Sequence, residues 1–303
     1  MERQYILHMF TPGRQISPFD VNMAVDAGYQ VVVPYGEVGP DNVAAMTQDA
    51  IFSRGPKGCR YTGLFIGGRD VIVAADMLDL ARKAMVAPFA VAAFADPSGA
   101  YTTAAAMIAC VERQMRTAHG TDLVNKRVLL LGGSGPVGRI VGVLAARLGA
   151  SVVLASHRGI DRARGATDET NRRFDTDLRP VATDTAAALH EQLALSQVVC
   201  ATAAAGAQVM NEDAVVAARA LLVAADVNAV PPAGIAGVGA FDDGKLLAGS
   251  ASGAIAIGAL AIGNVKYQTQ HRLFLQMREA SAAVYLGIEE ALAVARLVVT
   301  KAD

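Results

Sequence analysis

Residues 126–158 constrain the fold of this chain more than any other segment. An apolar run at residues 127–131 leads directly into a G-x-G-x-x-G turn at residues 133–138. A helical pattern at residues 136–148 and a second apolar run at residues 151–155 follow. The glycine pattern alone could be a plain loop of any α/β protein. The order strand, turn, helix and strand within one βαβ-sized unit instead favours a dinucleotide site.

The three glycines of this turn have separate expected roles. Gly133 is expected to make the tight turn, Gly135 to let the backbone approach a pyrophosphate, and Gly138 to let the helix pack close to the strand. Pro136 suits the first turn of a helix whose free N–H groups would face the phosphates. The cofactor-binding residues predicted here are Gly133, Ser134, Gly135, Pro136, Val137 and Gly138.

The end of the second strand bears on the choice between NAD and NADP. An NAD site usually carries Asp or Glu about 20 residues after the glycines, to bind the ribose 2′-hydroxyl. Here the sequence reads Ser156-His157-Arg158, followed by Arg162 and Arg164. A guanidinium without an acid favours the 2′-phosphate of NADP, so Ser156, His157 and Arg158 are predicted to bind it. The alternative, a solvated helix face, fits Arg164 better than Arg158.

Strand and helix patterns alternate along the rest of the chain. Strands are predicted at residues 5–10, 30–34, 62–66, 89–95, 179–182, 197–201 and 221–225, and helices at residues 17–28, 41–54, 70–85, 101–116, 161–174 and 185–194. Two further helical segments lie between residues 257 and 297. This alternation predicts an α/β fold with an N-terminal parallel α/β domain at residues 1–120 and a Rossmann dinucleotide-binding domain at residues 121–263. Helices at residues 264–303 are expected to pack back on the first domain.

Loops that follow parallel strands form the ligand-binding edge of such sheets. In the second domain these loops are residues 202–206 and 226–232, which would flank a bound nicotinamide. Thr202, Ala203, Asp226 and Asn228 complete the predicted cofactor site.

Composition excludes several classes of protein. The 303 residues are 53% hydrophobic with a net charge of −1, which gives no basic stripe for nucleic acid. The apolar runs at residues 85–95 and 253–263 fall short of the roughly 20 residues that a membrane helix needs, and the first ten residues lack the order of a signal peptide. A cytoplasmic protein with three reduced cysteines is therefore expected. The five histidines are dispersed, so no metal site is predicted.

Several sequence blocks resemble one known family. They are residues 6–9, 17–24, 49–54, 65–68, 94–99, 226–237 and 258–270, which together span nearly the whole chain. The chain resembles the NAD(P)-dependent methylene-tetrahydromethanopterin dehydrogenases of methylotrophic bacteria. The resemblance implies a fold similar to methylene-tetrahydrofolate dehydrogenases, with a pterin cleft between the two domains. Members that accept NAD tend to carry an acid where this chain has Arg158, so NADP is the expected cofactor and NAD remains possible.

The resemblance also implies a reaction and a set of substrate contacts. A hydride would leave the methylene carbon that bridges two pterin nitrogens, with tetrahydromethanopterin as cosubstrate in one-carbon oxidation. The predicted catalytic residues are Asp20 and Lys266. The predicted substrate-binding residues are Asp20, Asp96, Ser98, Thr102, Lys266 and Gln270.

Each of the charged candidates has a structural alternative. Asp20 could be a first-turn acid that complements a helix dipole, Asp96 could cap the helix that follows it, and Lys266 could be simply solvated. Alanine-rich helices with apolar faces, taken with the resemblance, suggest a homo-oligomer, and a trimer is expected.

Three other functions are compatible with parts of the pattern. The first is the same oxidation acting on methylene-tetrahydrofolate, because residue spacing does not distinguish the two pterins. The second is a non-catalytic NADP-binding sensor. The third, an added cyclohydrolase, would need residues that activate water, and no residue set is committed to that.

Overall fold

A computed structural model describes residues 3–300, and its chain divides into two units. The first contains residues 1–102 and 267–294, and the second contains residues 103–266 and 295–303. The predicted boundary was residue 120, after the long helix α5 (Ala100–His119). The division falls earlier because α5 is bonded within the second unit. Arg113 and Gln114 both contact the carboxylate of Asp243, and His119 contacts the carbonyl of Leu222.

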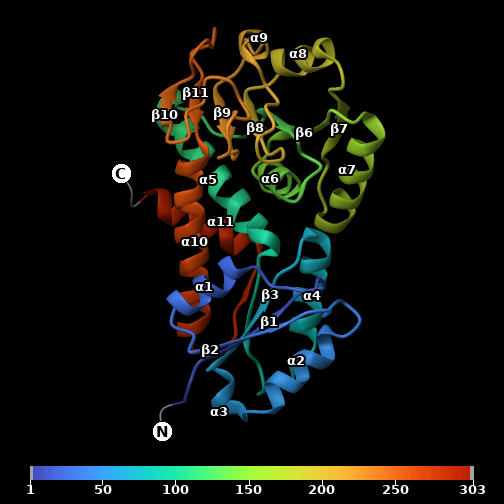
Figure 1. The fold of residues 1–303 in the computed structure, drawn as a ribbon, viewed down its shortest axis with the longest axis vertical. Helices are drawn as coiled ribbons and strands as arrows, with labels where there is room; N and C mark the ends of the chain where they lie inside the picture. The colour runs from blue at the N-terminus through green and yellow to red at the C-terminus, as the bar shows by residue number, and fades with distance from the viewer. Residues whose placement is uncertain (1–2, 301–303) are drawn as a thin grey trace. The chain divides into compact units, whose positions relative to one another are not determined.

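The first unit is built on a five-stranded parallel sheet in the order β12-β4-β3-β1-β2 (Figure 1). Its strands are β1 (Ile6–Phe10), β2 (Val31–Tyr35), β3 (Thr62–Ile66), β4 (Ala92–Ala95) and β12 (Tyr285–Leu286). Its helices are α1 (Pro18–Asp26), α2 (Val43–Phe52), α3 (Pro56–Cys59) and α4 (Val71–Lys83), with a short 3₁₀ turn at Pro97–Gly99. Two late helices, α10 (Ala259–Glu279) and α11 (Ile288–Thr300), contribute residues to both units.

An aromatic cluster explains why α10 returns to the first sheet. Phe65 on β3, Phe94 on β4 and Phe274 on α10 are fully buried. Their ring centroids lie 5.3–5.5 Å apart, which is the separation of favourable edge and tilted ring contacts. A helix distant in sequence thus completes the core of the first unit.

The second unit contains a seven-stranded sheet in the order β10-β11-β9-β8-β5-β6-β7 (Figure 1). Its strands are β5 (Arg127–Leu131), β6 (Ser151–Ser156), β7 (Arg179–Ala182), β8 (Val198–Ala201), β9 (Val223–Asp226), β10 (Asp243–Leu246) and β11 (Ile255–Ile257). Its further helices are α6 (Pro136–Arg147), α7 (Ile160–Phe174), α8 (Ala186–Ala194) and α9 (Glu212–Ala217). Apart from antiparallel β10, the strands are parallel in the doubly wound order, which reverses direction between β5 and β8.

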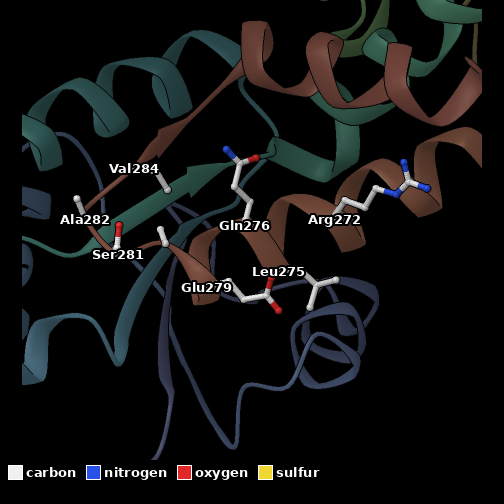
Figure 2. A pocket seen from close by; sticks show the side chains of 8 residues that line it. Arg272, Leu275, Gln276, Glu279, Ser281, Ala282 and Val284 are labelled. Atoms are coloured by element: carbon white, nitrogen blue, oxygen red, sulfur yellow. The ribbon is translucent and has the colours of Figure 1, made fainter.

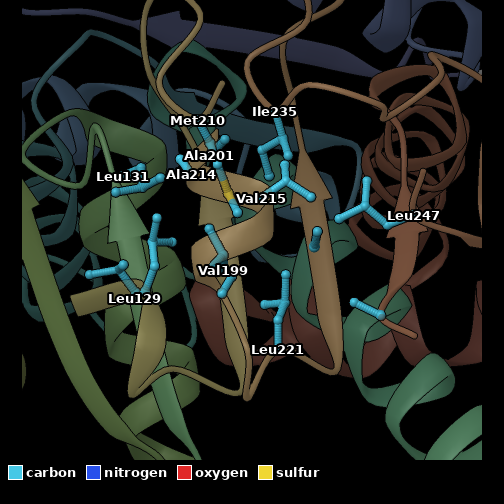
Figure 3. Packing of buried hydrophobic residues seen from close by; sticks show 14 of the residues in the cluster. Leu129, Leu131, Val199, Ala201, Met210, Ala214, Val215, Leu221, Ile235 and Leu247 are labelled. Carbon is cyan, nitrogen blue, oxygen red and sulfur yellow. The ribbon is translucent and has the colours of Figure 1, made fainter. Parts of the chain in front are cut away.

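Alternating residues of these strands build the core on one face of the second sheet. Leu129, Leu131 and Val199 point to the same face because side chains alternate along a strand. Figure 3 shows them with Val215 of α9 and Ile235, which lies in the loop after β9. Strand β5 is therefore buried from Val128 to Leu131, as the continuous apolar run at residues 127–131 predicts.

The sequence pattern was wrong in detail at two places. The predicted strand at residues 89–95 is shorter, because Val86 and Phe89 exchange backbone hydrogen bonds in a tight bridge before β4 begins. The stretch before residue 257, where no strand was predicted, contains β10 and most of β11. Within the described residues, no helix is both long enough and apolar enough to cross a bilayer.

Candidate functional site

The turn between β5 and α6 is shaped by two adjacent glycines. Gly132 takes the left-handed conformation at φ +73°, and a Cβ on it would lie 2.6 Å from the backbone of Ala203. Gly133, which the sequence predicts in the tight turn, lies within it, because the N–H of Gly135 donates to the carbonyl of Gly132 at 3.2 Å; the left-handed residue of the turn is Gly132 and not Gly133. Gly133 is instead crowded, since its Cβ would lie 2.9 Å from the side chains of Leu130 and Leu154.

Gly138 provides the close packing that the sequence predicts for it. A Cβ at this position would lie 2.6 Å from the Cα of Gly133 and 2.6 Å from the hydroxyl of Thr202. The hydroxyl itself bonds to the carbonyl of Leu131 at 3.2 Å, which ties the loop after β8 to the end of β5. The first turn of α6 therefore lies directly against the two central strands.

We expect Gly138→Ala to disrupt this packing. Backbone and a bonded hydroxyl block the new methyl group, so the free energy of unfolding should fall by about 1–3 kcal/mol, and cofactor binding should weaken with it. Chemical denaturation and cofactor titration measure the two effects. Gly263→Ala in α10 is the matched control, because nothing lies within 4 Å of its Cβ position. An unchanged unfolding midpoint for Gly138→Ala would contradict the packing described here.

The amino-terminal end of α6 is suited to an anionic ligand. The residue that precedes the helix is Gly135, which has no side chain to accept the free N–H groups of the first turn. A Cβ on Gly135 would make ordinary contacts with the carbonyl oxygens of Gly132 at 3.5 Å and Thr202 at 4.0 Å. A helix end whose N–H groups no side chain caps is the arrangement that cradles a pyrophosphate. The residues present therefore fit a dinucleotide.

The residues predicted to bind the adenosine end are not equivalent. Ser156 is buried at the end of β6, and its oxygen accepts the backbone N–H of Arg158 at 3.1 Å. The side chains of His157 and Arg158 are exposed. Ser156 therefore shapes the turn into α7, while His157 and Arg158 remain accessible to a ligand.

A buried carboxylate organises the loop after β9. The Asp226 side chain is 1% exposed and accepts backbone N–H groups from Asn228 at 2.9 Å, Gly234 at 2.7 Å and Ile235 at 3.2 Å. Burial raises the pKa of the Asp226 carboxyl, and these three hydrogen bonds offset part of that rise. The carboxylate thus closes a loop that the sequence predicts beside the nicotinamide.

Asn228 joins this loop to the one after β8. Its side-chain oxygen accepts the N–H groups of Gly206 and Val230, both at 3.0 Å, and its amide donates to the carbonyl of Pro232 at 2.8 Å. The polar groups of Asp226 and Asn228 are thus bonded to loop backbone. These bonds shape the loop after β9 and connect it to the loop that carries Thr202 and Ala203.

In the first unit, Asp20 and Gln270 form a buried pair. Asp20 on α1 is 3% exposed and Gln270 on α10 is fully buried. The Gln270 amide donates to the Asp20 carboxylate at 2.7 Å. Lys266 is half-buried and lies one helical turn before Gln270 on α10. The charge of a buried carboxylate acts more strongly on neighbouring groups than the charge of an exposed first-turn acid would, because burial lowers the local dielectric constant.

Asp96 caps the helix that follows it. Its carboxylate accepts the backbone N–H of Tyr101 at 2.9 Å, the N–H of Thr102 at 3.2 Å and the hydroxyl of Thr102 at 2.6 Å. Ser98 donates its hydroxyl to the carbonyl of Gly68 at 2.8 Å, which links this turn to the loop after β3. Asp96 and Thr102 are completely buried, whereas Ser98 is exposed. Of the three, Ser98 is the side chain placed to meet a ligand.

A pocket of about 570 Å³ lies along the last turns of α10 and the segment that leads into β12 (Figure 2). Figure 2 shows Arg272, Gln276 and Glu279 along α10, with Ser281 and Val284 on the following segment. None of the predicted site residues lines this pocket. Between residues 3 and 300, no three His, Cys, Asp or Glu side chains cluster as metal ligands would.

Comparisons with known proteins agree with these features. Residues 18–98 match the family described as methylene-tetrahydromethanopterin dehydrogenase, N-terminal. The chain is 44% identical to the NAD(P)-dependent methylenetetrahydromethanopterin dehydrogenase of Methylorubrum extorquens, over 94% of this chain and 96% of that one. It is 33% identical to the bifunctional protein MdtA of the same organism, over 92% of this chain and 94% of that one.

Solved structures agree at the level of the fold. A shikimate 5-dehydrogenase from Listeria monocytogenes matches with a TM-score of 0.51 and 13% identity, over 96% of each chain. A 5-ketofructose reductase from Gluconobacter matches with a TM-score of 0.50 and 14% identity, over 98% of this chain and 99% of that one. The fold is thus that of Rossmann-like dehydrogenases. From its identity to a full-length relative, the chain belongs to the methylenetetrahydromethanopterin dehydrogenase family.

Proposed function

We propose that this chain transfers a hydride from 5,10-methylene-tetrahydromethanopterin to NADP and gives methenyl-tetrahydromethanopterin, a step of one-carbon (formaldehyde) oxidation. The observation that carries the proposal is the family membership. The start of α6 supports it, because no side chain caps its free N–H groups and such a helix end fits the pyrophosphate of a dinucleotide.

The reaction needs positioning and electrostatics rather than proton transfer. Loss of a hydride leaves a cation that the two pterin nitrogens stabilise, so no general base is required. A bound nicotinamide supplies the hydride acceptor. We assign to Asp20 the role of favouring the positive charge that develops on the pterin, with Gln270 holding its carboxylate in place. Lys266 and Ser98 are proposed to contact the substrate.

NADP is proposed in preference to NAD. The end of β6 offers no acid to the ribose 2′-hydroxyl, and the exposed guanidinium of Arg158 follows it directly. Guanidinium groups form paired, charge-assisted hydrogen bonds with phosphate.

A spectrophotometric assay that crosses two pterins with two cofactors tests the function. We expect NADP reduction with methylene-tetrahydromethanopterin, little activity with methylene-tetrahydrofolate, and slower reduction of NAD. Addition of a chelator should leave the rate unchanged. Greater activity with the folate would favour the second substrate, binding of NADP without turnover of either pterin would favour a sensor, and loss of activity that a divalent ion restores would contradict the metal-free mechanism.

A homo-oligomer, and a trimer in particular, is also proposed. Phe241 and Leu246 lie beside and within the edge strand β10 and are 81% and 67% exposed, which is unusual for large apolar side chains so close together. Light scattering should give a mass near three times 31.4 kDa, and Phe241→Ser with Leu246→Ser should lower it. A wild-type mass near that of one chain would contradict the assembly.

A further inference from the structure

A cavity of about 250 Å³ in the first unit lies at the amino-terminal ends of β3 and β4. Thr62 and Ala92, the first residues of these two strands, line it. Asp96 and Ser98, in contrast, follow the carboxyl end of β4. Because β3 and β4 are parallel, the cavity and these two residues lie at opposite edges of the sheet. The cavity is therefore separate from the predicted substrate contacts Asp96 and Ser98.

Small apolar side chains line much of this cavity. They come from the segment before β4, from the end of α10 and from the residues that follow it, and include Ala90, Ala92, Met277, Ala280, Ala282 and Ala283. Figure 2 shows Ser281 and Ala282 on the segment that leads from α10 to β12. The Cys59 thiol also lines the cavity, but it donates to the carbonyls of Ile51 and Gly55. The wall therefore offers mainly methyl and methylene groups to a ligand.

Thr62 and Arg60 supply hydrogen-bond donors to the same cavity. Thr62 is 4% exposed, and its side-chain oxygen accepts a hydrogen bond from Arg54 at 3.5 Å. Between residues 3 and 300 the Thr62 hydroxyl donates to no other group, so its proton is available to a ligand. The Arg60 guanidinium lies 4.6 Å from the centre of the Tyr61 ring and donates to the Tyr61 hydroxyl at 2.5 Å. These contacts hold the guanidinium in place and leave further N–H groups for a ligand.

The charge around the cavity is positive. Arg60 is the one charged side chain that lines it. Lys57 on α3 and Arg54 lie close to it in the chain, and Arg54 donates to the carbonyls of Gln4 and Tyr61. In the part of the chain that the structure describes, none of these three cations forms an ion pair with a carboxylate. The cavity should therefore attract an anion.

We propose that this cavity binds a short-chain aliphatic carboxylate, whose oxygens accept hydrogen bonds from Arg60 and Thr62 while its chain lies against the alanine methyl groups and Met277. A guanidinium matches the two oxygens of a carboxylate with paired, charge-assisted hydrogen bonds. The volume sets the length of the chain. A cavity of about 150 Å³ holds benzene, so 250 Å³ suits a slightly larger ligand such as hexanoate. This site does not depend on the proposed pterin reaction.

Binding of hexanoate and of hexanamide, measured by ligand-detected NMR titration, tests this site. The two ligands have the same chain, but only hexanoate is charged. The wild type should bind hexanoate about ten-fold more tightly, the lower end for a hydrogen bond to a charged group, because Arg60 is exposed to water. Arg60→Gln should abolish this difference and leave hexanamide within about two-fold. From butanoate to hexanoate, wild-type affinity should rise by about two-fold to four-fold with each CH₂ group.

Lys57→Gln is the matched control, because it removes a positive charge from an exposed position on α3 that does not line the cavity. It should bind both ligands as the wild type does. Ala90→Leu places a larger side chain at the half-buried wall and should prevent binding of both ligands.

Three results would overturn the inference. They are a wild type that shows no saturable binding of hexanoate or binds it no better than hexanamide, an Arg60→Gln protein indistinguishable from Lys57→Gln, and a folded Ala90→Leu protein that binds hexanoate with wild-type affinity. Circular dichroism establishes whether Ala90→Leu folds. If it does not fold, the comparison of Arg60→Gln with Lys57→Gln decides the question alone.

Discussion

Asp20→Asn is expected to lower kcat for the pterin by about 100-fold to 1,000-fold, the range found when one preorganised electrostatic group is removed from an active site. The substitution preserves the size of a side chain that is 3% exposed, but it removes the negative charge. Because the cation develops only as the hydride leaves, the effect should fall on kcat more than on KM. The dissociation constant of NADP, measured by direct titration, should not change.

Asp26→Asn is the control for this change, since it makes the same substitution at an exposed position on the same helix. It should retain wild-type kcat. Gln270→Ala should lower kcat less than Asp20→Asn, because the carboxylate remains but loses a donor at 2.7 Å. If Asp20→Asn turns over at the wild-type rate, Asp20 serves the helix α1 and not the reaction.

Arg158→Asp is expected to reverse the choice of cofactor. Hydrogen bonds to charged groups contribute about 1.5–3 kcal/mol, so Arg158→Ala alone should raise KM for NADP by roughly ten-fold to a hundred-fold while KM for NAD changes little. Aspartate adds repulsion against the 2′-phosphate and an acceptor for the 2′-hydroxyl, so the NADP-to-NAD ratio of kcat/KM should fall further. The loss in Arg158→Ala should shrink at high salt, where screening has already weakened the pair.

Arg172→Ala is the control, because it removes the same charge from an exposed position near the other end of α7. Its NADP-to-NAD ratio should match that of the wild type. An unchanged ratio in Arg158→Ala would place Arg158 on a solvated surface. Cofactor choice would then depend on residues other than Arg158.

The second unit could be predicted from sequence because its signals are local. A buried strand, a glycine-rich turn and a helix that starts with Pro136 follow one another without interruption, and the predicted helix at residues 136–148 is one residue longer than α6. Which glycine of the turn is left-handed could not be predicted. Gly132 and Gly133 are adjacent, and the sequence does not show that the backbone of Ala203, in the loop after β8, lies against Gly132.

Contacts between distant segments account for what the sequence left open. Asp20 and Gln270 were both predicted as site residues, but their pairing depends on the return of α10 to the first sheet. The sequence left two roles open for Asp96, a helix cap and a substrate contact. An acid in either role would lie at the same position, directly after a strand. Strands β10, β11 and β12 have two to four residues each, too few to establish a period.

The side chains of Asp226 and Asn228 hold two loops of the second unit in place. The Asp226 carboxylate accepts three hydrogen bonds and the Asn228 side chain makes three more, one of which joins the loop after β9 to the loop after β8. These loops are thus ordered when the chain folds. Ligand binding does not have to pay the conformational entropy of ordering them.

If these loops flank the dinucleotide as proposed, we expect them to keep one shape from one turnover to the next. Their backbone N–H groups are bonded to Asp226 and Asn228 without a ligand, so the loops should not have to refold before another dinucleotide enters. Exchange of the dinucleotide should therefore be governed by its own diffusion and by the contacts it breaks on leaving, and not by the opening and closing of this part of the chain.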